Sequence, residues 1–251
     1  MRSNPIPFLI SLAALVLIWV WAAYATDDPS ILPLPWNVLG LMYSEAVTGP
    51  LFGHMAATLL RVAAAFSIAM AIGLALGLWL GRSHLANQWF GPWVVVFLNI
   101  PALVVIVLCY LWIGLNEVAA IVAVAVNKTA MVTVTMREGA AALDRPLADL
   151  SRAFRLSRWS ELRHVILPQL YPYVFSSMRN GIAVIWKIVL VVEFLGRPNG
   201  VGFQIHLYFQ LFETGYVLAY AFSFVALMLL VEYALFAPWE RRANAWRAQP
   251  V

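Results

Sequence analysis

The chain has 251 residues, of which 63% are hydrophobic and 11% charged, and its formal net charge is +4. A soluble domain of this length is rarely so apolar, so we expect a membrane protein. The lone Cys109 excludes an intrachain disulfide framework. The excess of basic over acidic residues would indicate a nucleic-acid partner only if the orientation of the chain in a membrane did not explain it.

Apolar stretches long enough to cross a hydrocarbon core of roughly 30 Å occur repeatedly along the chain. We predict an all-α polytopic membrane protein with six membrane helices, near residues 6–25, 54–80, 89–113, 116–136, 173–195 and 215–237. The first stretch follows a basic start, as a signal peptide does. It is long for such a peptide and its tryptophans suit an interface, so we interpret it as a retained helix.

Arginine is concentrated in alternate loops. It is found before the first predicted helix, after the second, between the fourth and fifth, and after the sixth, at positions 2, 82, 137, 145, 152, 155, 158, 163, 241, 242 and 247. The opposite loops carry mainly acids: Asp27, Asp28, Glu45, Glu117 and Glu213. The positive-inside rule then places both termini and the arginine-rich loop in the cytoplasm. Because topology explains the basic charge, we do not expect nucleic acid as a partner.

The second and third predicted helices carry packing and bending signals. Gly73, Gly77 and Gly81 are four residues apart and predict a ridge for close helix contact. Pro101 should kink the third helix because it lacks a backbone donor. Asn99 would then either line a pore or hydrogen-bond to a neighbouring helix.

Charged residues also fall inside the apolar stretches, at Arg61, Lys128, Lys187, Glu193 and Glu232. Each costs roughly 2.5 to 3.5 kcal/mol on insertion scales, so such groups usually face a bundle interior. In one interpretation the lysines, with Asn127 and Trp186, offer positive potential to an anionic solute. In the other, Lys187 pairs with Glu193, or Lys128 with Glu232. The sequence leaves both open.

The loop between the fourth and fifth helices predicts two short amphipathic helices. Asp144 would cap the first, with Pro146 in its first turn. Ser157 would cap the second, which Pro168 should stop. Their apolar faces would either lie on the inner leaflet or dock on a protein partner.

Polar and aromatic residues after the fifth helix, LGRPNGVGFQIHLYFQLFETG, predict a segment in the outer interface. Its Asn-Gly pair is also a general turn signal. The four histidines, at positions 54, 84, 164 and 206, lack ligand spacing, and the sequence has neither a nucleophile motif nor a phosphate-binding loop. We therefore expect neither an enzyme nor a bound metal.

Four stretches, in order, resemble the membrane subunit of bacterial ABC importers, in the group that handles nitrate, sulfonates, taurine and pyrimidine precursors. They are ATLLRVAAAF, NIPALVVIVLCYLWIGLNEVA, LSRWSELRHVILPQLYPYVFSSMR and NGVGF, between Thr58 and about Phe203. The resemblance implies a type I importer-like permease that acts as a homodimer in lipid. It also implies a separate ATPase pair that holds ATP and Mg, a periplasmic solute-binding protein and a small solute, with no cofactor on this chain.

In that family the cytoplasmic loop carries Glu-Ala-Ala, three residues, Gly and a distal Leu-Pro, and docks on the ATPase. The matching positions here hold Asp149, Leu150, Ser151, Arg155, Leu167 and Pro168. An arginine in place of glycine should avoid a positive φ, so we expect the turn to follow Leu156 and Ser157 instead. The resemblance assigns ATPase coupling to Asp149, Leu150, Ala153, Phe154, Arg155, Leu156, Ser157 and Trp159.

The resemblance also divides the chain into residues 1–53, a core over 54–238 with a coupling loop at 137–168, and a cytoplasmic tail at 239–251. The residues assigned to the translocation pathway are Asn99, Pro101, Asn127, Lys128, Trp186, Lys187 and Glu193. An external loop near the gate would contain Asn199, Gly200, Gly202 and Phe203. Two other classes remain: an ion-coupled secondary carrier that uses Lys128, Glu193 and Glu232, and a passive membrane scaffold.

Overall fold

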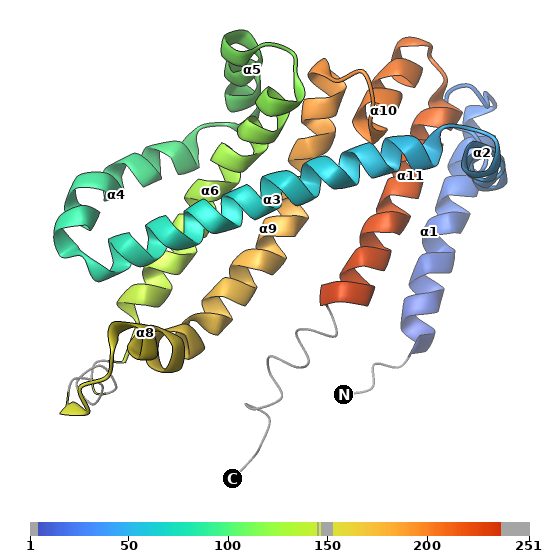
Figure 1. Cartoon of the computed structure of the whole chain (residues 1–251). Coiled ribbons are helices and arrows are strands. Elements are labelled where there is room, and N and C mark those ends of the chain that lie inside the picture. The colour runs from blue at the N-terminus through green and yellow to red at the C-terminus, as the bar shows by residue number, and fades with distance from the viewer. Residues whose placement is uncertain (1–4, 145, 147–152, 237–251) are drawn as a thin grey trace. The chain divides into compact units, whose positions relative to one another are not determined.

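A computed structural model describes residues 5–144, 146 and 153–236, which form helices joined by short connections (Figure 1). The helices are α1 (Pro5–Thr26), α2 (Pro35–Val47), α3 (Leu51–Arg82), α4 (His84–Asn99), α5 (Ala102–Ile113), α6 (Glu117–Ala141), α8 (Arg158–Glu161), η1 (Leu162–Ile166), α9 (Leu167–Gly196), α10 (Val201–Gln210), α11 (Thr214–Val231) and η2 (Glu232–Phe236). Both η segments are π-helical. The described part of the chain holds no strand, and the all-α prediction is confirmed.

Four described helices are long and apolar enough to cross a membrane alone: Leu9–Thr26, Leu51–Arg82, Glu117–Ala141 and Thr214–Ala234. A fifth span results if α4 and α5 are counted together, although they are bent by 96°. The remaining predicted span, 173–195, lies within α9, whose 30 residues are interrupted by charged side chains. The predicted spans thus coincide with helix, except that 89–113 is divided between α4 and α5. Four or five of the six predicted spans are long and apolar enough to cross a membrane.

The described residues group into two compact units. Unit 1 draws on residues 1–58 and 193–230, and unit 2 on residues 59–192 and 231–251. In unit 1, Trp19 of α1 donates from Nε1 to the carbonyl of Pro33, at 3.1 Å, and stacks on Phe222 of α11. Glu45 of α2 accepts a hydrogen bond of 2.6 Å from the Tyr220 hydroxyl of α11. These contacts join α1 and α2 to α11.

Aromatic packing also attaches α10 to α11 within unit 1. Tyr208 stacks on Tyr216 with ring centroids 4.5 Å apart. Burial raises the pKa of the Tyr208 phenol, and the negative charge of Glu45 raises it further. The α10 helix is therefore held along its length, and only its last residues extend into solvent-exposed surface.

In unit 2, the glycine ridge of α3 packs directly on α6. A Cβ atom built on Gly73, Gly77 or Gly81 would lie 2.5 or 2.6 Å from a side-chain carbon of α6. The α6 residues that they meet are also four apart: Val132, Met136 and Ala140. The close-packing prediction is confirmed, since only a residue without a side chain lets the two helices approach this closely.

The predicted kink at Pro101 is a complete break. The α4 helix ends at Asn99, Ile100 is extended with φ −70° and ψ 125°, and Pro101 is the N-cap of α5. A proline ring disfavours helical backbone in the residue before it and removes one donor from the helix. The axes of α4 and α5 therefore meet at a bend of 96°, with a break between the two helices.

The prediction that Pro168 stops a helix is wrong. Pro168 lies in the first turn of α9, which also runs through Pro172 to Gly196. The preceding η1 segment is wider than an α-helix, and the N–H of Leu167 donates to the carbonyl of Leu162, five residues back. The helix thus continues past Pro168, which has no N–H, directly after this π-helical turn, in which the hydrogen bonds span five residues instead of four.

The glycine ridge predicts a contrast within a single helix. Gly77→Ala should destabilise the protein by about 1–3 kcal/mol, because the added methyl group overlaps Met136. Gly53→Ala, also in α3, is the control, since nothing lies within 4 Å of its added Cβ. Thermal unfolding in detergent should show a lower midpoint for the first variant only. Equal midpoints would contradict this packing.

Candidate functional site

The coupling segment, which we define as the described residues 153–166, exposes aromatic side chains beside a capped helix. Ser157 caps this helix, as predicted: its hydroxyl accepts a hydrogen bond of 3.2 Å from the Ser160 N–H. Phe154 is 72% exposed and Trp159 is 68% exposed. Asp149 and Leu150, predicted to share this role, lie outside the described residues, as does most of the helix expected after Asp144.

Arg155 corrects the sequence expectation about the turn. Phe154 and Arg155 form the turn, and Arg155 has a φ of 51°, so the reversal precedes Leu156 and does not follow it. Left-handed backbone costs a non-glycine residue about 1–2 kcal/mol. The Arg155 side chain is exposed. The arginine therefore keeps the backbone form that glycine would adopt more easily.

A second candidate site is a buried polar network in unit 1, centred on Glu193 in the last turn of α9. Glu193 is 0% exposed, and its Oε2 accepts hydrogen bonds of 2.9 Å from the Thr58 hydroxyl and from the Gly202 N–H. The Thr58 hydroxyl also accepts from the Val201 N–H at 2.9 Å. One carboxylate thus joins α9, α3 and the start of α10.

His54 extends this network by one helical turn of α3. Its Nδ1 accepts from the Gly200 N–H at 3.0 Å, and its Nε2 lies 2.6 Å from Nε2 of Gln204. Gly200 has a φ of 111°, and a Cβ there would overlap the Glu193 carboxylate. Both features require glycine at position 200. The predicted external loop is thus attached through its backbone.

Sequence reasoning named Glu193, Gly200 and Gly202 for other roles, and it missed His54 and Thr58. A signal was present. His54, Thr58 and Arg61 are spaced by four and three residues on an otherwise apolar stretch, so they share one face of α3. Such a polar stripe in a membrane helix indicates a buried network.

Arg61 forms an ion pair that the sequence did not indicate. Its Nε and Nη2 donate to the two carboxylate oxygens of Glu117 at 2.8 and 2.6 Å. Glu117 is the first residue of α6, where a carboxylate also interacts favourably with the helix dipole. The pair joins α3 to the start of α6 within unit 2.

Lys128 is the most buried lysine of the described chain, with 1% exposure. Its ammonium group contacts the Met131 sulfur at 2.8 Å and the Asn180 carbonyl at 3.4 Å. The pairing with Glu232, one of the alternatives that the sequence left open, does not form, because the Glu232 carboxylate lies instead 3.9 Å from Arg179. In the described part of the chain, the partners of the Lys128 ammonium group are therefore a backbone carbonyl and a thioether sulfur.

The other predicted pathway residues are dispersed. Trp186 is buried, Asn127 is half-buried and Lys187 is exposed. Asn99 donates from Nδ2 to the Val95 carbonyl of its own helix at 2.7 Å, which corrects the expectation of a bond to a neighbouring helix. None of these residues lines the groove between α3, α4 and α6.

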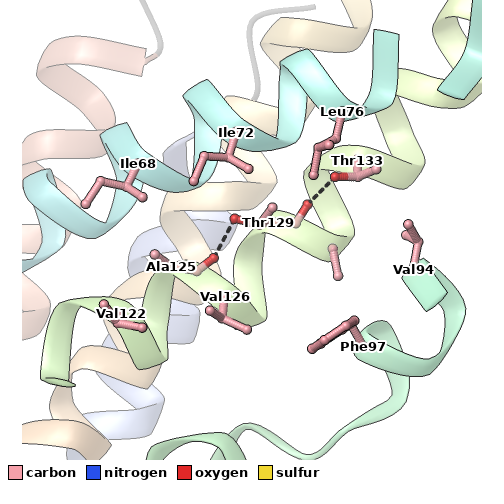
Figure 2. Close-up of a pocket in the computed structure, with 11 residues that line it drawn as sticks. Ile68, Ile72, Leu76, Val94, Phe97, Val122, Ala125, Val126, Thr129 and Thr133 are labelled. Carbon is pink, nitrogen blue, oxygen red and sulfur yellow. Dashed lines mark hydrogen bonds between the residues drawn. The ribbon is translucent and has the colours of Figure 1, made fainter. Parts of the chain in front are cut away.

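An apolar groove of about 380 Å³ lies between α3, α4 and α6 (Figure 2). Thr129 and Thr133 are its only hydroxyl-bearing residues, and each hydroxyl donates to a carbonyl four residues earlier, at 2.7 and 2.8 Å. The remaining lining residues have hydrocarbon side chains, among them Ile72, Val126 and Phe97. The groove therefore has no charged group to hold an ionic solute.

Several membrane-crossing helices with charged groups in their interior define a multi-pass membrane protein of the transporter class. Residues 69–237 match the family described as the binding-protein-dependent transport system inner membrane component. The match covers more than half of the chain, and the chain belongs to that family.

Relatives agree with this assignment. The chain is 26% identical over 236 residues to an aliphatic sulfonates transport permease protein of Bacillus subtilis, covering 94% of this chain and 85% of that protein. It is 26% identical over 244 residues to the taurine transport system permease protein of Escherichia coli, covering 93% and 88%.

A solved structure, of an amino acid ABC transporter with histidines, matches 80% of this chain and 98% of its own, with a TM-score of 0.63 and 23% identity. That likeness supports the fold. Family and relatives together make the chain a membrane subunit of an ABC importer in the inner membrane. Such a subunit works with a separate ATPase and a solute-binding protein, so this chain is not itself the enzyme.

The backbone of Arg155 predicts an unusual stabilising substitution. Arg155→Gly should stabilise the protein by up to about 1 kcal/mol, because glycine adopts a positive φ without steric cost. Leu156→Gly, one residue later and without a positive φ, should destabilise it. Thermal unfolding of the purified variants measures both effects. A lower midpoint for Arg155→Gly would contradict the turn described here.

Proposed function

We propose that two copies of this chain form the translocation unit of an importer for small organic anions. ATP hydrolysis by the separate ATPase would drive transport through the coupling segment. The observation that carries this proposal is the exposure of Phe154, in the turn, and of Trp159, in α8. The arginine-rich loops support a cytoplasmic location for both. Family membership supports an ATPase as their partner, because the family requires a surface for that subunit.

The ATPase would meet the aromatic side chains of the coupling segment in a groove of its own. Apolar side chains this exposed are costly in water and gain most of their binding free energy when a partner covers them. The proposed docking surface also includes the residues in and beside the turn: Ala153, Arg155, Leu156 and Ser157. Asp149 and Leu150 belong to the same proposed surface. The alternative occupant, the inner leaflet, would bury the aromatic rings without a link to ATP hydrolysis.

The arrangement in the membrane follows from charge. The arginine-rich loops support a topology with both termini in the cytoplasm and with residues 199–203 outside. We also propose that the chain is divided into an N-terminal part, residues 1–53, a permease core, residues 54–238, and a cytoplasmic tail, residues 239–251. Lipid would cover the apolar helix faces, which carry many exposed leucine, isoleucine and valine side chains.

The solute class is proposed from two observations. The relatives are named for aliphatic sulfonates and for taurine, and these compounds share a sulfonate group that is ionised at neutral pH. Lys128 supplies a buried cation in a membrane span, and buried ionisable groups there commonly mark a solute or ion route. We keep Asn99, Pro101, Asn127, Trp186 and Lys187 in the proposed pathway. Glu193 differs from these residues because it accepts a hydrogen bond from the start of α10.

The coupling role predicts a loss of assembly with the ATPase. Phe154→Asp should abolish co-purification of the ATPase, because a carboxylate cannot enter an apolar groove without losing its hydration. Phe209→Asp, which changes a phenylalanine 61% exposed at the end of α10, is the matched control and should assemble normally. Pull-down from detergent-solubilised membranes measures both.

The outcome that would refute the importer mechanism is transport without the ATPase. Proteoliposomes that contain this chain alone, free of ATP and given a proton or sodium gradient, should accumulate no labelled taurine or ethanesulfonate. Accumulation would favour an ion-coupled carrier. Normal assembly with the ATPase but no movement of any tested solute by the complete complex would favour a scaffold.

The pathway role of Lys128 predicts a trade between stability and transport. Lys128→Met should raise the thermal midpoint, because it replaces a poorly compensated buried cation with an apolar chain of similar length. The same change should reduce sulfonate uptake at least about tenfold, equivalent to 1.4 kcal/mol. Lys187→Met, at an exposed position, controls for the stability effect. A stabilised variant with normal uptake would remove Lys128 from the pathway.

A further inference from the structure

Three successive backbone N–H groups at the start of α10 are held by side chains from other helices. The N–H groups of Gly200, Val201 and Gly202 donate to His54, Thr58 and Glu193 respectively, at 3.0, 2.9 and 2.9 Å. We call these three side chains the α10 latch. All of them, with the loop they hold, belong to unit 1.

The latch replaces a local helix cap. Gly200 is the N-cap of α10 and has no side chain to accept from the first turn. The first N–H groups of a helix need an acceptor, and the positive end of the helix dipole favours an anion there. Glu193 supplies that anion from α9, in a fully buried position. A protonated Glu193 would be a weaker acceptor and would lose the interaction with the dipole.

The latch also requires a particular form of His54. Because Nδ1 accepts from Gly200, the ring proton must lie on Nε2, which faces the side-chain amide of Gln204. The buried Oε1 of Gln204 has no partner as placed. Exchanging the amide oxygen and nitrogen puts Oε1 against the Nε2 proton and satisfies both groups. The neutral Nε2–H tautomer of His54 therefore fits both the Gly200 N–H and the Gln204 side chain.

A second proton on His54 would oppose one of these contacts. Nδ1 would become a donor and would face the Gly200 N–H, so that hydrogen bond would be lost. The groups around the ring differ in their effect. Glu193 from α9, together with Glu45 from α2 through Tyr220 of α11, contributes negative charge that favours the protonated ring, whereas Phe203 and Gln204 from α10 carry no charge.

We propose that His54, Thr58 and Glu193 are positioning residues, which hold residues 199–203 in the form that the solute-binding partner recognises only while His54 is neutral and Glu193 is charged. This inference rests on the proposed function, in which residues 199–203 lie outside. It goes further, because it makes partner-stimulated transport dependent on external pH. The latch is complete while the His54 ring is neutral and opens when external acid adds a second proton to the ring.

The first experiment needs no partner. Hydrogen–deuterium exchange of the full chain in lipid nanodiscs, corrected for the intrinsic pH dependence of exchange, reports on the amides of residues 200–204. Thr58→Val should reduce their protection about tenfold, because it removes both the acceptor of the Val201 N–H and the hydroxyl that donates to Glu193. Thr58→Ser keeps the hydroxyl and should retain protection. Unchanged protection in Thr58→Val would overturn the latch.

The same measurement tests the role of His54. Lowering the pH from about 7.5 to about 5.5 should reduce protection in the wild-type chain, because the ring becomes protonated. In His54→Asn, the amide oxygen replaces Nδ1 as the acceptor and does not titrate, so protection should be independent of pH. A pH-independent wild type, or an equal pH response in His54→Asn, would overturn the pH dependence.

The second experiment uses the assembled transporter in proteoliposomes with the solute-binding protein that is co-expressed with it. The ratio of stimulated to unstimulated ATP hydrolysis should fall about tenfold in Thr58→Val and in Glu193→Gln, and Thr58→Ser should restore it. A normal ratio in Thr58→Val, despite lost protection of residues 200–204, would make the latch purely structural and refute the proposal. The proposed function is tested separately by ATPase co-purification, which these variants should retain.

Discussion

Every polar group that enters a membrane must find its partner within the protein, because hydrocarbon offers none. This constraint explains most of the side-chain contacts within the helices. Thr129 and Thr133 turn their hydroxyls to carbonyls of their own helix, and Arg61 meets both oxygens of Glu117. Glu193 accepts from a hydroxyl and from a backbone amide. The apolar composition alone would allow many helix arrangements, but few satisfy these groups together.

Close helix approach is the second consequence of the same environment. In lipid, apolar side chains gain little by moving from acyl chains to another helix, so packing depends on shape. The ridge of Gly73, Gly77 and Gly81 lets α3 reach α6, where Val132 and Met136 occupy the space that glycine leaves. Met136 continues into an apolar cluster with Ile166 and Leu170, which ties η1 and the start of α9 to α6. The coupling segment is therefore anchored to a rigid helix pair at one end.

The two candidate sites use backbone geometry in different ways. At the coupling segment, Arg155 accepts a strained φ so that Phe154 is displayed before the helix capped by Ser157. At the α10 latch, Gly200 adopts a positive φ without strain and leaves room for the Glu193 carboxylate. The first arrangement exposes apolar side chains, and the second buries a carboxyl group that holds the backbone of a loop. Both place the functional detail in short connections between long helices.

The sequence by itself determined the all-helical membrane class, the close-packing glycines, a kink at Pro101 and the cap at Ser157, because each depends on local composition or on one residue's own chemistry. That the kink is a complete break between two helices was found only in the structure. Only the tertiary structure decided which charges meet. Sequence spacing gave no indication that Arg61 pairs with Glu117, 56 residues away, or that Thr58 joins Glu193, 135 residues away. The continuation of helix through Pro168 and the positive φ of Arg155 also depended on neighbours, since a π-helical turn and an exposed chain reversal overrode the local preference of each residue.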